Sequence, residues 1–227
     1  MRSGALTIVS LRSLIFCSNR IMQRSTKPLY CIGASQTKRL IETPAVQQLF
    51  KRAGFRIIDW TKPGASTEEL VQWIWEQRLY PRLRHGIKVE PNAIALVWTG
   101  TNDVLRLTSR NRNIETFKAG FKNMQKLLRR NFRKSIFVKV VPIPKTPERN
   151  TVIDMVNSFI ASHAKPYIKV VDNYSSFLTS NGGIIERFYE PTMGYGKRLR
   201  TDRIHLNEAG LTLVGRLIIS TLNAFPN

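Results

Sequence analysis

The chain has 227 residues, 42% of them hydrophobic, which is enough for the core of one medium-sized α/β domain. Its 36 Lys or Arg residues against 15 Asp or Glu give a formal net charge of +21. A charge of this size favours contact with polyanions such as nucleic acid or an anionic membrane surface. No run reaches the roughly 18 consecutive apolar residues of a membrane-spanning helix, so the sequence predicts no transmembrane segment.

The use of cysteine and histidine excludes two further classes of protein. The two cysteines, Cys17 and Cys31, do not supply a disulfide framework, which favours an intracellular, reducing compartment. The three histidines, His85, His163 and His205, are too scattered to match the ligand spacing of a zinc site. We therefore expect neither a metal ion nor another cofactor.

Residues 1–27 form a basic leader. They contain no acidic residue and carry Arg2, Arg12, Arg20, Arg24 and Lys27. This composition is closer to an organellar, mitochondrial-like targeting segment than to a secretory signal, because Arg12 interrupts the apolar stretch. The alternatives are a disordered basic leader, or an upstream extension with Met22 nearer the true start. We expect the folded domain to span residues 28–227.

From residue 28 onward, short apolar runs alternate with amphipathic segments. The runs are bounded by Gly, Pro, Thr or Asn, as expected of strands buried on both faces. The predicted strands are residues 29–33, 55–59, 93–98, 136–141 and 168–172. Apolar residues of the intervening segments recur at helical spacing. The predicted helices are residues 39–53, 67–80, 114–130, 152–163 and 208–223.

Strand–helix alternation repeated five times predicts a three-layer α/β/α fold, with a parallel, doubly wound sheet between two layers of helices. No internal repeat or second domain boundary is visible. We expect loops over the proline-rich residues 142–147 and over residues 173–201, which are rich in Gly and Ser. Long loops in compact domains often carry function.

Polar residues follow the predicted strands, at the edge of a parallel sheet where ligands bind. Ser35 follows the first strand, Gly64 the second and Asn102 the third. Asp202 and His205 end the long loop before the last helix. A hydroxyl, an imidazole, a carboxylate and amide donors on one edge are the groups that acyl transfer needs.

Each of these groups has a role in that chemistry. His205 can take the proton of the Ser35 hydroxyl, and Asp202 can hold the imidazole in the required tautomer. The amides of Ser35, Gly64 and Asn102 can donate to the oxyanion of a tetrahedral intermediate. Each also has a structural interpretation: Ser35 and Asn102 as caps, Gly64 as a turn glycine, and His205 as a capping or core histidine.

Together these residues resemble the four sequence blocks of the SGNH or GDSL-like hydrolases, in the same order. The blocks are Gly33-Ala34-Ser35, Gly64 within PGAST, Gly100-Thr101-Asn102-Asp103, and Asp202-x-x-His205. The resemblance spans residues 28–224 and implies a five-stranded parallel sheet of flavodoxin-like topology. It also implies a serine esterase with Ser35 as nucleophile, Asp202 and His205 completing the triad, and Gly64 and Asn102 lining the oxyanion hole.

Two further points qualify the resemblance. The family usually has Asp at the position of Ala34, and this departure bears on local geometry and on activity. The spacing, the VxxVP strand after a basic helix and the positive charge are loosely similar to one subset of the family. These are the esterase domains in the first open reading frame of some non-LTR retrotransposons.

The positive charge is concentrated in residues 104–149, which carry thirteen Lys or Arg against two Glu. Within it, Arg129, Arg130, Arg133 and Lys134 form either a solvated helix end that suits the macrodipole or a patch that binds phosphates. A response-regulator-like or flavodoxin-like function is disfavoured, because the sequence lacks the acidic pocket or glycine-rich phosphate loop of those proteins.

Two functions therefore compete. The first is hydrolysis of a small-molecule or lipid carboxylic ester through an acyl-enzyme, without a cofactor. The second is a nucleic-acid- or anionic-lipid-binding module on the same scaffold, with weak or lost catalysis.

Overall fold

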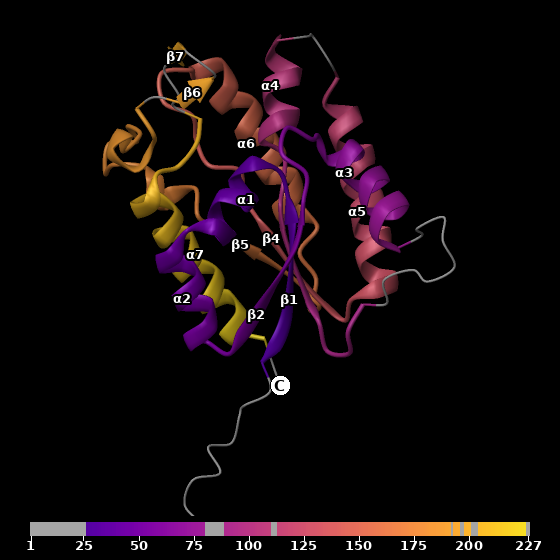
Figure 1. Cartoon of the computed structure of the whole chain (residues 1–227). Coiled ribbons are helices and arrows are strands. Elements are labelled where there is room, and N and C mark those ends of the chain that lie inside the picture. The colour runs from indigo at the N-terminus through magenta and orange to yellow at the C-terminus, as the bar shows by residue number, and fades with distance from the viewer. Residues whose placement is uncertain are drawn as a thin grey trace, which may run out of the picture.

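Figure 1 shows the computed structural model of the chain, which describes residues 26–79, 89–109, 113–191, 193–195, 198–200 and 204–225. Residues 1–25, which make up nearly all of the predicted basic leader, lie outside the described residues. The first strand begins at Lys27, one residue before the predicted start of the domain. Asp202 also lies outside the described residues.

Five parallel strands form the central sheet. They are β1 (Lys27–Gly33), β2 (Phe55–Thr61), β3 (Ile94–Trp98), β4 (Lys134–Val138) and β5 (Ile168–Val171). Their order is β2-β1-β3-β4-β5, and every neighbouring pair is parallel. This is the flavodoxin-like order, in which the direction of winding reverses between β1 and β3. The expected fold class is confirmed.

Helices cover both faces of the sheet (Figure 1). One face carries α1 (Ser35–Glu42), α2 (Pro44–Arg52) and α7 (Glu208–Asn223). The other carries α3 (Thr67–Ile74), α4 (Thr101–Ser109), α5 (Ile114–Asn131) and α6 (Pro147–Ser162). A core cluster lies under each helix layer, and successive β1 side chains alternate between them: Tyr30 and Ile32 enter one, Leu29 and Cys31 the other.

The helix expected over residues 39–53 is two helices, because α1 ends at Glu42 and α2 begins at Pro44. Proline disfavours helical backbone in the residue before it, and Thr43 is accordingly extended, with φ −71° and ψ 117°. α1 also begins earlier than predicted, at Ser35. The side chains of Leu40, Ile41, Val46 and Phe50 face the sheet and are buried.

The predicted strand over residues 136–141 is displaced, since β4 spans Lys134–Val138. Beyond it, the Val140 N–H donates to Asn157 Oδ1, and the Val140 carbonyl accepts from Asn157 Nδ2, both at 2.8 Å. A side chain of α6 thus replaces a neighbouring strand as the partner of this backbone. α6 itself begins at Pro147 rather than at residue 152, because proline at the first helical position forfeits no hydrogen bond.

Two segments for which the sequence predicted no helix or strand contain regular structure. α4 follows β3 directly, and its buried residues are Asp103 and Val104, too few for a periodic apolar stripe. The loop predicted over residues 173–201 contains two 3-10 turns and a small hairpin. These are Ser175–Phe177, Glu186–Phe188, and β6 (Met193–Tyr195) with β7 (Arg198–Arg200). The predicted helix over residues 67–80 passes from α3 into a π-helical turn, η2 (Trp75–Leu79).

The strands define two edges of the sheet. At the carboxyl edge, uppermost in Figure 1, β1, β2 and β3 lead into α1, α3 and α4. At the amino edge, lowest in the figure, the strands begin and α2, α5 and α7 end. In the described parts of the chain, no helix is both long and apolar enough to span a membrane.

Candidate active site

The carboxyl edge brings Ser35 and His205 together across 170 residues of sequence. His205 Nε2 lies 2.9 Å from Ser35 Oγ, a hydrogen-bond distance at which the imidazole can accept the hydroxyl proton. Both side chains are half-buried, so each is fixed by its surroundings and still open to a ligand.

Ser35 owes its position to the tight turn between β1 and α1. A Cβ on Gly33 would lie 1.9 Å from Thr37 Oγ1 and 2.3 Å from the Trp98 carbonyl oxygen, so only glycine fits there. Thr37 Oγ1 donates to that carbonyl at 2.8 Å and ties the start of α1 to the end of β3. The serine is therefore carried by rigid elements.

The first turn of α1 has no side-chain cap, because Ala34 precedes it. By contrast, α3 and α7 begin with capping side chains, those of Ser66 and Asn207. The first amides of a helix have no intrahelical acceptor and carry partial positive charge. The Ser35 N–H is one of them. Alanine at position 34 therefore places no side-chain acceptor at the cap position to compete for these amides.

Gln36 connects the serine to the histidine loop. Its Nε2 donates to the Ile204 carbonyl at 2.7 Å, and its Oε1 accepts from the Leu206 N–H at 3.4 Å. The side chain is 3% exposed. It thus bridges the two peptide groups that flank His205 while being the sequence neighbour of Ser35. Nothing in the sequence pointed to Gln36, because its partners lie 168 and 170 residues away.

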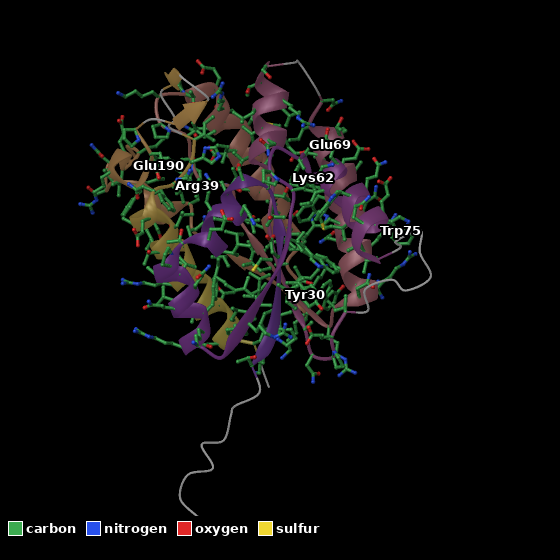
Figure 2. All side chains as sticks on the ribbon, viewed as in Figure 1. Tyr30, Arg39, Lys62, Glu69, Trp75 and Glu190 are labelled. Atoms are coloured by element: carbon green, nitrogen blue, oxygen red, sulfur yellow. The ribbon has the colours of Figure 1, made fainter. Side chains whose placement is uncertain are left out.

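A second segment supports the histidine loop from the other side. The Glu190 N–H donates to the His205 carbonyl at 2.9 Å. The Glu190 carboxylate in turn forms a salt bridge with the Arg39 guanidinium of α1, and Figure 2 shows the two residues on neighbouring elements. The loop is thereby held to α1 at two points, Gln36 and Arg39.

The other two predicted site residues come from the next strand ends. Asn102 Nδ2 donates to the Ala65 carbonyl at 3.0 Å, and the Lys62 N–H donates to the Gly33 carbonyl at 2.9 Å. These bonds tie together the turns that follow β1, β2 and β3. A side-chain amide has two N–H donors, so one donor of Asn102 is left for a ligand. Gly64 has φ +77°, a backbone conformation that favours glycine.

Arg106 clamps the turn that carries Gly64. Its Nη2 donates to the Gly64 carbonyl at 3.1 Å, and its two terminal nitrogens bind both carboxylate oxygens of Glu69 at 2.7 and 2.9 Å. Glu69, labelled in Figure 2, also accepts from the Ser66 N–H at 3.0 Å. The Arg106 guanidinium lowers the pKa of Glu69 to about 2. No sequence pattern pointed to this role for Arg106.

Asp103 is structural. It is 7% exposed, and its carboxylate accepts the Thr67 N–H at 3.0 Å and the Thr67 hydroxyl at 2.9 Å. Burial raises the pKa of Asp103 to about 6, against the opposing effect of the Thr67 hydrogen bonds. It joins the start of α4 to the start of α3.

The predicted site residues thus divide into three groups. Ser35, His205, Gly64 and Asn102 come from loops of the carboxyl edge, and hydrogen bonds link those loops. Asp202 lies outside the described residues. The basic residues Arg129, Arg130, Arg133 and Lys134 lie at the amino edge, where α5 ends and β4 begins. Among the described residues, no cluster of three or more His, Cys, Asp or Glu side chains could hold a metal ion.

The structure therefore defines a flavodoxin-like α/β protein with a serine–histidine pair at the ligand-binding edge of its sheet. A family model described as GDSL-like lipase/acylhydrolase matches residues 31–218, and the chain belongs to this family. Membership supports an esterase or acylhydrolase activity in general terms. No match was found among curated proteins.

Solved structures share the fold at low sequence identity. A GDSL-like lipase from Bacteroides thetaiotaomicron is 18% identical with a TM-score of 0.63, and the match covers 93% of this chain and 94% of that one. An acetyl xylan esterase is 18% identical with a TM-score of 0.63, over 86% and 99% of the two chains. The OSK domain of Drosophila Oskar is 17% identical with a TM-score of 0.59, over 86% and 88%.

Proposed function

We propose that the protein is a serine esterase that hydrolyses a carboxylic ester through an acyl-enzyme on Ser35. The observation that carries the proposal is the 2.9 Å separation of His205 Nε2 and Ser35 Oγ. A serine hydroxyl becomes a competent nucleophile when a base within hydrogen-bond reach can take its proton. Family membership supports the same class of reaction.

The proposed reaction runs in two halves. Ser35 Oγ attacks the ester carbonyl while His205 Nε2 takes the hydroxyl proton, and the tetrahedral intermediate collapses as His205 returns that proton to the leaving alcohol. Water then attacks the acyl-enzyme while His205 takes its proton, and the second tetrahedral intermediate collapses to the carboxylic acid as His205 returns the proton to Ser35 Oγ. Asp202, three residues before His205 in the sequence, is assigned the role of orienting the imidazole.

The oxyanion hole is assigned to the Ser35 N–H, the Gly64 N–H and the side-chain amide of Asn102. The uncapped start of α1 supports the first assignment. The bond from Asn102 to Ala65 and that from Arg106 to Gly64 support the other two, because they fix these donors before a substrate binds. Donors that need no reorganisation stabilise the developing charge most effectively.

The test is labelling with a fluorophosphonate probe, followed by peptide mapping, alongside hydrolysis of p-nitrophenyl acetate. We expect the label on Ser35, and we expect Ser35→Ala to lower kcat by about 10⁴-fold or more, as for other serine nucleophiles. The His205→Ala variant should lose labelling as well, since an unactivated serine reacts slowly with the probe.

Ser158→Ala is the matched control, because Ser158 is an exposed serine on α6. It should label and turn over like the unmodified protein. Circular dichroism of every variant separates loss of activity from loss of fold. A label on another serine, or turnover by Ser35→Ala at the unmodified rate, would remove Ser35 from the mechanism.

A further inference from the structure

The amino edge of the sheet gathers cations from four separate elements. Lys27 begins β1, Arg52 ends α2, Arg129 and Arg130 lie in the last turn of α5, and Arg133 precedes β4. These five residues are called the basic rim below. All five are exposed. They converge because β1 and β4 begin at this edge, where α2 and α5 end (Figure 1).

The basic rim borders three adjoining hollows. One, of about 780 Å³, is lined by residues that include Lys27, Arg133 and Lys134. A second, of about 500 Å³, is lined by Arg129, Arg130 and Arg133. A third, of about 340 Å³, is lined by Lys27, Arg52 and Lys134. The hollows are neighbours, because Arg133 lines the first and second, and Lys27 and Lys134 line the first and third.

The basic rim takes no part in the salt bridges of the described chain. Seven salt-bridge networks elsewhere in the described chain engage acidic residues, as in Arg39–Glu190 and Arg106–Glu69. Across the same described residues, no member of the basic rim forms a salt bridge. Glu90 is the acid that lines the largest hollow, and it pairs with Arg56. No salt bridge to a described acid therefore offsets the charge of the rim.

Helix dipoles neutralise only a small part of the positive charge of the basic rim. Cations at a helix carboxyl end offset a macrodipole worth about half a negative charge. Three helices, α2, α5 and α7, end at this edge, and together they offset less than two of the five positive charges. Most of the rim's charge is thus left uncompensated, and an extended polyanion is the complementary partner.

One exposed aromatic side chain indicates which polyanion fits. Tyr167 is 41% exposed and lines the same hollow as Arg129, Arg130 and Arg133. An aromatic ring beside a basic groove is the arrangement that binds single strands, with bases stacked and phosphates paired. The other exposed large apolar residues of the described chain, Trp75 and Met155, lie on η2 and α6, so the rim lacks the apolar face that inserts into a membrane.

We propose that the basic rim is a binding site for single-stranded nucleic acid. Its phosphates pair with Lys27, Arg52, Arg129, Arg130 and Arg133, and a base stacks on Tyr167. The site lies on the edge of the sheet opposite Ser35, and it does not depend on the proposed esterase activity.

The test is fluorescence anisotropy of the full chain with a labelled 20-nucleotide oligo(U) across a salt series. The variant is Arg129→Glu, Arg130→Glu and Arg133→Glu together. We expect affinity to fall about tenfold or more at moderate salt. We also expect the slope of log K against log salt to shrink by about 2, because each phosphate contact on a single strand contributes about 0.7.

The matched control is Lys118→Glu, Lys145→Glu and Arg149→Glu together, which changes net charge equally in residues that do not line these hollows. If both triple variants weaken oligo(U) binding equally, binding depends on the overall charge of the protein and not on the basic rim. That result would overturn the proposed site. Failure of the full chain to bind oligo(U) at moderate salt would overturn it as well. So would binding to phosphatidylserine vesicles alone.

Tyr167 supplies the second readout. Tyr167→Ala should weaken oligo(U) binding by about fivefold or more, since stacking one base on an aromatic ring is worth about 1–3 kcal/mol. Tyr167→Phe keeps the ring and should bind like the unmodified protein. If the two variants bind equally, no base stacks there and the single-strand assignment fails.

Discussion

At the scale of single residues, the candidate site depends on a side chain that takes no part in bond making. Gln36 bonds to the peptides on both sides of His205, and it follows Ser35 directly in α1. Any shift of the histidine loop relative to α1 must break these two hydrogen bonds. Gln36 is therefore assigned as a positioning residue for the serine–histidine pair.

Replacing Gln36 should lower turnover more than substrate binding. Gln36→Met keeps the length of the side chain and removes both hydrogen bonds. The His205 imidazole is then no longer held at hydrogen-bond distance from the Ser35 hydroxyl. Misplacement of a reacting group by about 1 Å can cost about 100-fold in rate. We expect kcat for p-nitrophenyl acetate to fall between about 10- and 100-fold with KM nearly unchanged, as measured by steady-state kinetics.

Gln36→Glu provides a graded comparison, because its carboxylate still accepts from the Leu206 N–H but cannot donate to the Ile204 carbonyl while ionised. Its kcat at neutral pH should lie between those of Gln36→Met and the unmodified protein. A Gln36→Met variant with unaltered kcat would show that the histidine loop holds its position without this side chain.

At the scale of elements, α3 and α4 are joined through a buried carboxylate. Asp103 of α4 accepts both donors of Thr67 at the start of α3. Burial raises its pKa from 3.8 to about 6, so the native state holds this proton at pH values where the unfolded chain has released it. Between pH 4 and 6 the native state binds more protons, and the contribution of Asp103 to stability falls as the pH rises.

The Asp103→Asn variant should remove this pH dependence. Its amide oxygen can still accept from the Thr67 N–H, and it does not ionise. With about 1.4 kcal/mol per pKa unit, the difference in unfolding free energy between variant and unmodified protein should shift by up to about 3 kcal/mol between pH 4 and 7. The shift favours the variant at pH 7. Urea denaturation at both pH values measures it.

Glu208→Gln is the control for removal of one negative charge, because Glu208 lies exposed at the start of α7. It should not reproduce the shift. An unfolding free-energy difference for Asp103→Asn that is the same at pH 4 and 7 would mean that Asp103 titrates alike in the folded and unfolded chains.

The elements predictable from the sequence were those defined by local pattern. α7 has its predicted bounds, 208–223, because its apolar stripe ends at both sides in polar residues. The break at Pro44 was also local, and the rule that proline ends a helix could have placed it. α4 was not predictable in this way. It is fixed by Asp103 to Thr67 in its first turn and by Arg106 to Glu69 in its last, which are contacts between segments more than 35 residues apart.

The residues of the candidate site likewise divide into those that the sequence pattern marks and those that depend on long-range contacts. Ser35, Gly64, Asn102 and His205 could be proposed from sequence because parallel strands deliver their carboxyl ends to one edge. The side chains that fix those residues could not. Gln36 and Arg106 act through backbone carbonyls and amides, and any residue type presents those groups, so no motif marks them.

At the scale of the whole molecule, the two proposed sites occupy opposite ends of the same strands. Ser35 and His205 lie beyond the carboxyl edge, and the basic rim lies at the amino edge. β3 has five residues, which at about 3.3 Å per residue separates the edges by about 17 Å. This distance exceeds the Debye length of about 8 Å at physiological salt, so charge at one edge is largely screened from the other.

Bound nucleic acid should therefore leave ester hydrolysis unchanged. With saturating oligo(U), we expect kcat/KM for p-nitrophenyl acetate to stay within about twofold, because a ligand couples two sites only through differential contacts or fields. The measurement is steady-state hydrolysis across an oligo(U) titration, with the control triple variant Lys118→Glu, Lys145→Glu and Arg149→Glu run in parallel. A KM that rises in proportion to bound oligo(U) would place both ligands at the carboxyl edge and contradict the two-edge arrangement.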